Sequence, residues 1–193
     1  MTKPIATRSR IRRHPERGVP DETSAILGEG SVAHVGFSDG LGPVVIPLLY
    51  GFSPERPDRI VLHGSRASRL QNLLAEGVPV CVTVTLLDGL VYSRSAKFHS
   101  ANYRSVVCFG RANEIADPAA KESALAEMTA RYFPGRTSGS DYSPPSRGDL
   151  DEITVVEVLI EESSAKARSG GPAGPHDGGS IATGSAGVID HRG

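Results

Sequence analysis

The segment 63–70, with the sequence HGSRASRL, is the part of the chain whose residue types and spacing best suit a chemical task. Gly64 lets a ligand approach the backbone closely, and the guanidinium groups of Arg66 and Arg69 can each hold phosphate oxygens with two hydrogen bonds. The hydroxyl of Ser68 adds a donor between them. A helix that begins here would also attract an anion through its free N–H groups and dipole. The segment therefore predicts a phosphate site, and the alternative is a serine-capped helix with solvated arginines.

A second polar cluster, residues 93–105, joins two expected strands. It contains more hydrogen-bonding side chains than a simple connection requires, although a polar loop with serines at the strand edges is the alternative. A phosphate site with this cluster and apolar strands nearby indicates a phosphorylated, partly aromatic ligand such as flavin mononucleotide, FMN. His99 is the candidate acid or base near such a ring, and His63 is the second.

Signatures of other chemistries are absent from the sequence. Residues 28–33 start like a dinucleotide fingerprint, but they follow an expected helix and precede an expected strand, the reverse of the required order. Residues 135–139 lack the Lys-Ser/Thr pair of a phosphate-binding P-loop, and there is no G-x-S-x-G elbow. No histidine has another histidine four residues away, and Cys81 and Cys108 are too few for a four-thiolate site. We therefore expect no metal, and two reduced thiols.

The elements that must position these residues are mainly strands. Alternating and β-branched runs predict strands at 31–37, 43–50, 59–63, 78–87, 90–96, 103–115 and 153–160. Asp88-Gly89 predicts a hairpin turn, and Pro47, which has no N–H, requires a strand edge or a bulge. Hairpins between sequential strands favour an antiparallel barrel or sandwich over a Rossmann domain.

Two or three helices are expected beside these strands. A short one is capped by Asp21, and a longer one follows Asp117-Pro118, with proline at its first position. A further helix would open at Gly64-Ser65 and present Arg66 on the same face as Leu70 and its apolar neighbours.

Composition divides the 193 residues into one domain with two tails. We expect a flexible basic arm at 1–18, a domain at 19–168 and a disordered glycine-rich tail at 169–193, with a flexible loop at 134–150. The 21 Lys and Arg nearly balance the 22 Asp and Glu, so there is no overall field for nucleic acid or an anionic membrane. No run reaches the roughly 20 apolar residues of a membrane span, and no signal peptide is evident, so a cytoplasmic location is expected.

Five segments together resemble the pyridoxamine 5'-phosphate oxidase-like family of FMN-binding split-barrel proteins, and most closely its branch of 5-nitroimidazole-resistance reductases. They are residues 45–50, 62–69, 80–90, 102–111 and 162–168. The resemblance implies a six-stranded antiparallel Greek-key split barrel. It also implies a homodimer that holds FMN at the subunit interface and acts on a small-molecule substrate.

The resemblance assigns roles to particular residues. Ser68 and Arg69 would hold the FMN phosphate, with His63 and Gly64 lining its approach. The backbone of three residues on one strand would lie beside the flavin ring, and a polar contact would come from a facing strand. These residues are Ile46, Pro47, Leu48 and, on the facing strand, Ser105.

Two departures separate this chain from the vitamin-salvage oxidases of the family. Leu70 stands where they commonly have a lysine, and residues 164–168 replace their Arg-Leu-His-Asp-Arg-like segment. Arg66 could supply the missing charge, but pyridoxamine-phosphate oxidase activity is not expected. The function predicted is an FMN-dependent oxidoreductase working through flavin N5. The alternatives are a non-catalytic flavin- or haem-binding module and a reductase that uses the deazaflavin F420 on the same barrel.

Overall fold

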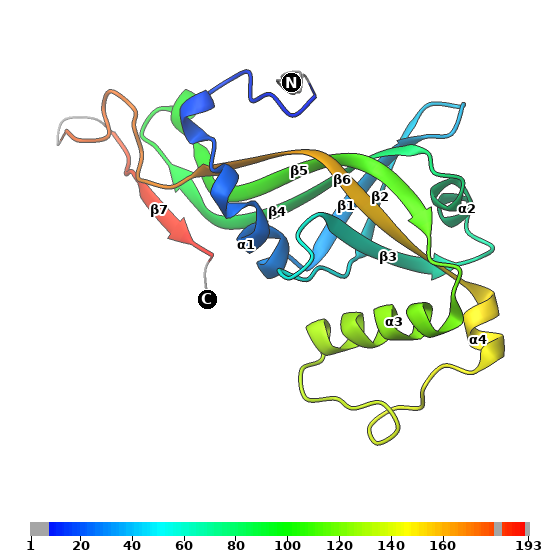
Figure 1. The fold of residues 1–193 in the computed structure, drawn as a ribbon. Helices are drawn as coiled ribbons and strands as arrows, with labels where there is room; N and C mark the ends of the chain where they lie inside the picture. Colours follow the sequence, from blue (N-terminus) through cyan, green and yellow to red (C-terminus); the bar gives the residue numbers. More distant parts are fainter. Residues whose placement is uncertain (1–7, 180–182, 192–193) are drawn as a thin grey trace.

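The structure of the protein, a computed structural model, describes residues 8–179 and 183–191. Within these residues seven strands form one sheet, in which every pair is antiparallel and the order is β2-β1-β4-β5-β6-β3, with β7 beside β4 (Figure 1). The strands are β1 (Val32–Ser38), β2 (Pro43–Leu49), β3 (Arg59–Ser65), β4 (Pro79–Tyr92), β5 (Ser100–Glu114), β6 (Ile153–Arg168) and β7 (Gly187–Asp190). The sheet curls into a half-barrel, which confirms the predicted split-barrel fold.

The predicted hairpin at Asp88-Gly89 is wrong. β4 runs through both residues, and the register with β5 shifts between Leu87 and Gly89, so Asp88 is the extra residue of a β-bulge. The Asp88 side chain is buried and accepts hydrogen bonds from Arg104 on β5. An aspartate and a glycine satisfy a bulge as well as a turn, and the buried partner on β5 favours the bulge.

A second bulge lies between β5 and β6. Phe109 is opposite Glu162 and Gly110 is opposite Ile160, which leaves Glu161 as the extra residue. The backbone of the two strands comes so close at Gly110 that a Cβ there would overlap the carbonyl oxygen of Leu159. Only glycine fits this position.

In the described part of the chain, four α-helices flank the sheet: α1 (Thr23–Glu29), α2 (Arg69–Ala75), α3 (Pro118–Tyr132) and α4 (Arg147–Glu152). The start of α3 is confirmed, since the Asp117 carboxylate accepts the Ala120 N–H at 2.8 Å. The start of α2 differs from expectation: β3 continues to Ser65, and the helix begins four residues later than Ser65. The helix α4, at the end of the predicted 134–150 loop, is closed by a capping box between Ser146 and Asp149.

The core lies between the inner face of the curled sheet and helices α1 and α2. Alternate residues of β1, β4 and β5 supply it, as their period of two requires. Fully buried examples are Val35, Val82, Val84 and Val106. Val61 of β3 belongs to a smaller cluster beneath α3. None of the helices among the described residues is long and apolar enough to span a membrane.

Helix α1 is fastened to α3 and to the loop after β2 by two side chains. The hydroxyl of the fully buried Tyr50 lies 2.7 Å from the carbonyl oxygen of Leu27 and 3.0 Å from that of Gly30. Arg131 of α3 donates to the same two carbonyls and lies over the Tyr50 ring, 4.9 Å from its centroid. These contacts satisfy carbonyl groups that the end of a short helix would otherwise leave without donors.

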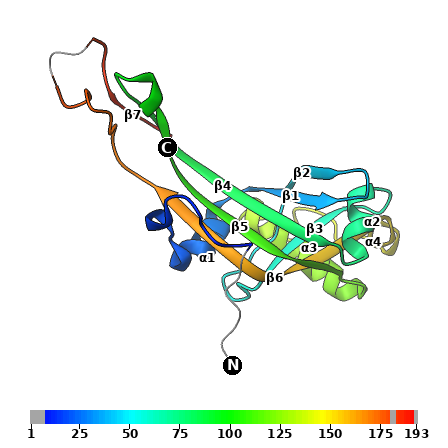
Figure 2. The same cartoon turned by 90° about the horizontal axis from the view of Figure 1, so that it is seen from above.

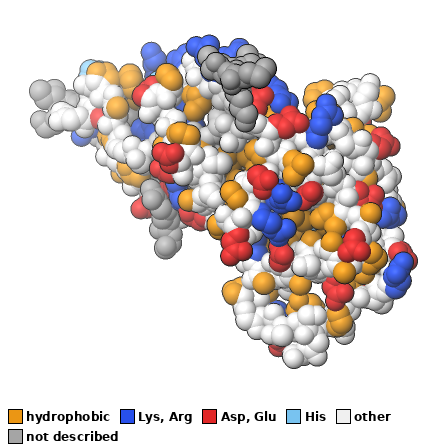
Figure 3. All heavy atoms as spheres, viewed as in Figure 1, with side chains coloured by type: hydrophobic (Ala, Val, Ile, Leu, Met, Phe, Trp, Pro, Cys, Tyr) orange, Lys and Arg blue, Asp and Glu red, His pale blue; other side chains and the backbone are white. Residues whose placement is uncertain are grey.

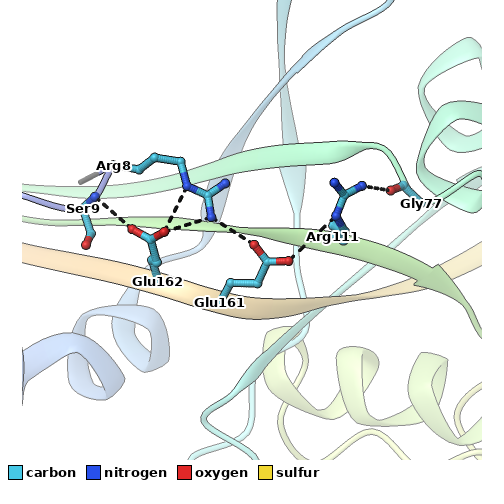
Figure 4. Close-up of polar contacts among 6 residues, drawn as sticks. All are labelled: Arg8, Ser9, Gly77, Arg111, Glu161 and Glu162. Atoms are coloured by element: carbon cyan, nitrogen blue, oxygen red, sulfur yellow. Dashed lines mark hydrogen bonds and ion pairs between the residues drawn. The ribbon is translucent and has the colours of Figure 1, made fainter. Parts of the chain in front are cut away.

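The described part of the N-terminal arm, residues 8–18, lies against β5 and β6 (Figure 4). Arg8 donates to both Glu161 and Glu162 at 3.0 Å, and its guanidinium lies 5.3 Å from the centroid of the Phe109 ring. The Ser9 N–H also donates to Glu162. The arm therefore covers the β6 bulge, while residues 1–7 lie outside the described part.

The glycine-rich tail contains a strand where the sequence analysis expected none. β7 pairs with residues 89–92 of β4, at the end of the β4–β5 ribbon that projects beyond the helices (Figure 2). The Asp177 carboxylate accepts hydrogen bonds from the Ser93 hydroxyl and the Arg94 N–H, both at 2.9 Å. Residues 180–182 and 192–193 of the predicted tail lie outside the described part.

Replacing Gly110 and Gly28 by alanine should have opposite effects on stability. We expect Gly110→Ala to lower the free energy of unfolding by about 3 kcal/mol or more, because the new methyl group overlaps the β6 backbone. We expect Gly28→Ala to raise it by about 0.5–1 kcal/mol, because Gly28 is helical and a Cβ there meets nothing within 4 Å. Urea unfolding of the two variants measures both changes, and equal effects would contradict this account of the bulge.

Candidate functional site

A groove of about 620 Å³ lies where β3 ends and the chain turns toward α2. His63 and Gly64 enter it from β3, and Arg66 from the turn. The opposite wall comes from the junction of α4 and β6, residues 151–153, which brings two acidic side chains. Part of the predicted phosphate segment therefore lines one cavity, and that cavity has both charges.

Arg66 is not on the helix face that was predicted for it, because α2 begins only at Arg69. Its Nη2 pairs with Glu114 at 2.9 Å, and its Nε donates to the Asp151 carbonyl at 3.1 Å. Its backbone N–H donates to the Glu152 carbonyl. Arg66 thus holds the turn against β5 and α4 and keeps an exposed guanidinium at the groove.

Ser68 and Arg69 lie at the start of α2, outside the lining of the groove. The Arg69 guanidinium pairs with Asp39 of the β1–β2 turn at 2.8 Å; the Arg69 side chain is 60 % exposed and that of Asp39 is 5 % exposed. Because the Arg69 guanidinium is exposed, a phosphate group can approach it from the solvent, but Asp39 is buried and would be left uncompensated if the pair broke.

His63 has a ring nitrogen with no partner. Its Nδ1 is buried and has no hydrogen bond among the described residues, and burial lowers the pKa of its imidazole from the ordinary 6.5. The ring is therefore neutral at pH 7. Beside it, Gly64 packs so closely on the buried Gln71 that a Cβ would lie 2.6 Å from Gln71 Nε2, and Gln71 Oε1 also has no described partner.

The residues expected beside a flavin ring lie on β2, which is the last strand of the sheet. Ile46 and Leu48 turn their side chains toward the core, and Pro47 faces outward opposite His34 of β1. Pro47 has no N–H to donate and was predicted to need a strand edge or a bulge, and β2 provides the edge. The backbone on the outer side of β2 has no strand partner among the described residues.

Ser105 and His99 are not brought to the groove. Ser105 lies within β5 and donates to the Lys166 carbonyl at 3.4 Å. His99 is exposed before the first residue of β5, whereas α2 packs near the other end of the sheet (Figure 1). At about 3.3 Å per residue, the 15 residues of β5 separate these ends by about 45 Å. Within one copy of the chain the predicted site residues do not form a single pocket.

Three groups that shape the site had no signal in the sequence analysis. Asp39 and Glu114 are the acidic partners of the two arginines, and Gln71 is the buried amide behind Gly64. No group of three or more His, Cys, Asp or Glu side chains in the described ranges could hold a metal ion.

Comparison with known proteins identifies a family and several structures that this chain resembles. Residues 20–167 match the family model described as pyridoxamine 5'-phosphate oxidase. The flavocytochrome Anf3 from Azotobacter vinelandii is 32 % identical with a TM-score of 0.84, over 97 % of this chain and 85 % of that one. The FAD and haem binding protein from Mycobacterium smegmatis is 32 % identical with a TM-score of 0.76, over 89 % and 82 %.

A more distant structure shares the fold. It is a putative 5-nitroimidazole antibiotic resistance protein from Bacteroides thetaiotaomicron, 24 % identical with a TM-score of 0.61 over 77 % of this chain and 83 % of that one. No curated protein matches the chain.

The buried neutral His63 should make stability depend on pH. The unfolded chain, in which the pKa of His63 is near 6.5, binds a proton before the folded chain does, so the fold loses stability as the pH falls through and below 6.5. We expect the loss of unfolding free energy between pH 7.5 and 5.0 to be smaller in His63→Gln than in the wild type. Urea unfolding at both values measures this loss, with His99→Gln as a control at an exposed position. A wild-type loss in His63→Gln would contradict the assignment.

Proposed function

The chain belongs to the pyridoxamine 5'-phosphate oxidase family, which is a flavin-binding family, and from this membership we propose that it is a flavin-dependent oxidoreductase. When bound, the flavin supplies electron transfer through N5 to or from a small planar substrate. The chain's own residues bind the phosphate, orient the ring and keep water from it. FMN is the proposed cofactor, because the basic and hydroxyl groups of 63–69 suit one terminal phosphate.

One observation carries this proposal: the β3–α2 turn presents two exposed guanidinium groups, those of Arg66 and Arg69. Arg69 with Ser68 would hold the phosphate, and Arg66 would add charge from the groove side. Both guanidinium groups are about half exposed, so a phosphate would add a charge-assisted contact to each from the solvent side. His63 is neutral and does not oppose the approach of an uncharged ring.

We also propose that the active form is a homodimer with the flavin at its interface. The outer face of the sheet supports this, because two neighbouring rows have no Asp, Glu, Lys or Arg from β2 to β5, and the second row meets Glu162 only on β6, where Arg8 pairs with it. Directly opposite residues share a face, and these rows are Pro47–His34–Thr83–Val107–Ser164 and Val45–Gly36–Cys81–Phe109. A second copy on this face can bring its β2 edge or its Ser105 toward the groove of the first.

The substrate is proposed to differ from that of the vitamin-salvage oxidases. Leu70, which replaces their lysine, is buried in the core and cannot contact a ligand. Arg168 donates to Asn102 and to the Gly171 carbonyl, so it fastens the tail to β5.

Haem is a second candidate ligand, alone or beside a flavin, because the Azotobacter relative is called a flavocytochrome and the Mycobacterium relative binds FAD and haem. In this chain His63 would hold the haem iron, since its imidazole is neutral and lines the 620 Å³ groove, and Arg66 beside it would pair with a propionate. The visible spectrum of the purified protein separates the two: a flavin absorbs near 450 nm and a haem gives a sharper band near 400 nm. Mass analysis of the released ligand distinguishes FMN, FAD and F420.

Removing the proposed phosphate contact should weaken flavin binding. We expect Arg69→Gln to raise the Kd for FMN by about 10-fold or more, because a charge-assisted contact is lost. Fluorescence titration with FMN, and separately with FAD, measures this. Arg147→Gln is the matched control, because Arg147 is an exposed arginine paired with Asp151. Absence of flavin binding by the wild type would overturn the proposed function.

Placing a charge on the proposed dimer face should separate the subunits. Val45 is 62 % exposed on β2, and Leu41 is 90 % exposed in the β1–β2 turn. We expect Val45→Asp to convert the dimer to a monomer with weakened flavin binding, and Leu41→Asp to stay dimeric. Sedimentation velocity measures both, and a monomeric wild type would contradict the proposed assembly.

A further inference from the structure

Lys121 of α3 is a buried lysine, which is rare because the ammonium group loses its water and needs a counter-charge. Its Nζ lies 3.3 Å from the carbonyl oxygen of Ile153 and 3.5 Å from that of Leu150, where α4 leads into β6. It also lies 3.7 Å from Oε1 of Glu114, the last residue of β5. Among the described residues, Glu114 is the one carboxylate within ion-pair distance of Lys121. Glu114 therefore supplies the counter-charge.

Glu114 is shared between two cations that differ in exposure. The same oxygen, Oε1, accepts a hydrogen bond from Nη2 of Arg66 at 2.9 Å. The Lys121 side chain is 6 % exposed, whereas the Arg66 side chain is 47 % exposed and lines the groove at the end of β3. Lys121 is therefore fixed beside Glu114, while Arg66 can turn toward a ligand from the solvent side.

The other charged groups around Glu114 have their own partners or face water. Acidic and basic side chains lie together on the face over β3 and α3 (Figure 3). Glu114 lines a cavity of about 360 Å³ with one arginine and three further carboxylates, which are Arg56, Asp117, Glu127 and Glu157. Glu127 and Glu157 are ion-paired with arginines, and Asp117 caps α3. On the groove side, Asp151 and Glu152 are exposed. Within the described ranges, only Arg66 and Lys121 lie within ion-pair distance of Glu114.

We propose that Lys121 is a positioning residue of the phosphate site: it keeps Glu114 neutralised while Arg66 exchanges that carboxylate for the phosphate of the ligand. This inference rests on the proposed function, because the phosphate is that of the flavin. Arg69 has no such arrangement, since the buried Asp39 has Arg69 as its one ion-paired cation in the described part of the chain. The exchange therefore costs less at Arg66 than at Arg69.

FMN and riboflavin, which has the same ring system but no phosphate, test the proposal by fluorescence titration. We expect Lys121→Met to raise the Kd for FMN about 10-fold, because Arg66 then stays with Glu114, and to leave the Kd for riboflavin unchanged. Lys121→Gln keeps a donor for the two carbonyl groups but not the charge, so it should show the same loss for FMN. Lys97→Met removes an exposed lysine outside the groove and should change neither Kd.

A second substitution at Glu114 separates the exchange from a simple loss of positive charge. In Glu114→Gln no carboxylate needs a counter-charge, so adding Lys121→Met should change the Kd for FMN by less than about 3-fold. A loss of FMN binding as large as in the wild-type background would overturn the proposal. An equal loss for FMN and riboflavin in Lys121→Met, or no loss for FMN, would also overturn it.

Urea unfolding without ligand tests the sharing of Glu114 independently of the flavin. In the wild-type background Arg66→Gln leaves Glu114 with Lys121, whereas in the Lys121→Met background it leaves Glu114 without a cation. We expect the second change to lower the urea midpoint about twice as far as the first. Equal shifts would contradict the shared pair and overturn the proposal. Absence of FMN binding by the wild type would instead overturn the proposed function, and with it the role of Lys121 in binding.

Discussion

The curvature of the sheet depends on two bulges, each of which places an acidic residue against an arginine. Asp88 is the extra residue of β4 and is held by Arg104, which also binds Glu29 of α1. Glu161 is the extra residue of β6 and is held by Arg8 from the arm. Bulges increase strand twist, and β4, β5 and β6, with 14, 15 and 16 residues, are long enough for that twist to curl the whole sheet.

No single strand is long enough to pair with the whole edge of β4 or of β6, so several segments pair with different parts of each edge. β1 pairs with β4 only at residues 81–84, and β7 takes over at 89–92. β3 pairs with β6 over 153–159; beyond it Gly18 of the arm forms a β-bridge with Lys166, and the next N–H, that of Val19, donates to the Ala165 carbonyl. Both tails therefore close sheet edges that would otherwise expose unpaired backbone groups. The phosphate segment lies where β3 leaves the ladder, and for this reason its neighbours are a turn and a short helix.

Local pattern in the sequence predicted what depends on local forces. The β-branched runs, the proline that needs an edge and the Asp117 cap all occupy the predicted places, because each is set by its own backbone. The prediction of a hairpin at Asp88-Gly89 was wrong because the contact that decides the structure there, from Arg104 to Asp88, comes from another strand. The predicted start of α2 was wrong because Ser65 remains in β3, where it pairs with Ile153 of β6, 88 residues away. Acidic partners such as Asp39 and Glu114 follow from the tertiary fold and leave no local signal. The family resemblance correctly supplied the overall fold, which spacing alone left open between barrel and sandwich.

Arginines of this chain differ in burial: one is paired with a buried carboxylate inside the fold, and others are exposed to solvent. Arg104 is held by a buried aspartate and by Glu29, which raise the pKa of its guanidinium, so breaking this pair would leave an uncompensated charge inside the fold. The guanidinium groups of Arg56, Arg66 and Arg69 are about half exposed, so water screens their ion pairs, although Asp39, the partner of Arg69, is buried. An arginine that contributes little to stability can change partners without unfolding the protein, and it keeps its full charge while it does so. The exposed arginines at the end of β3 therefore lie where the proposed phosphate group would meet the protein.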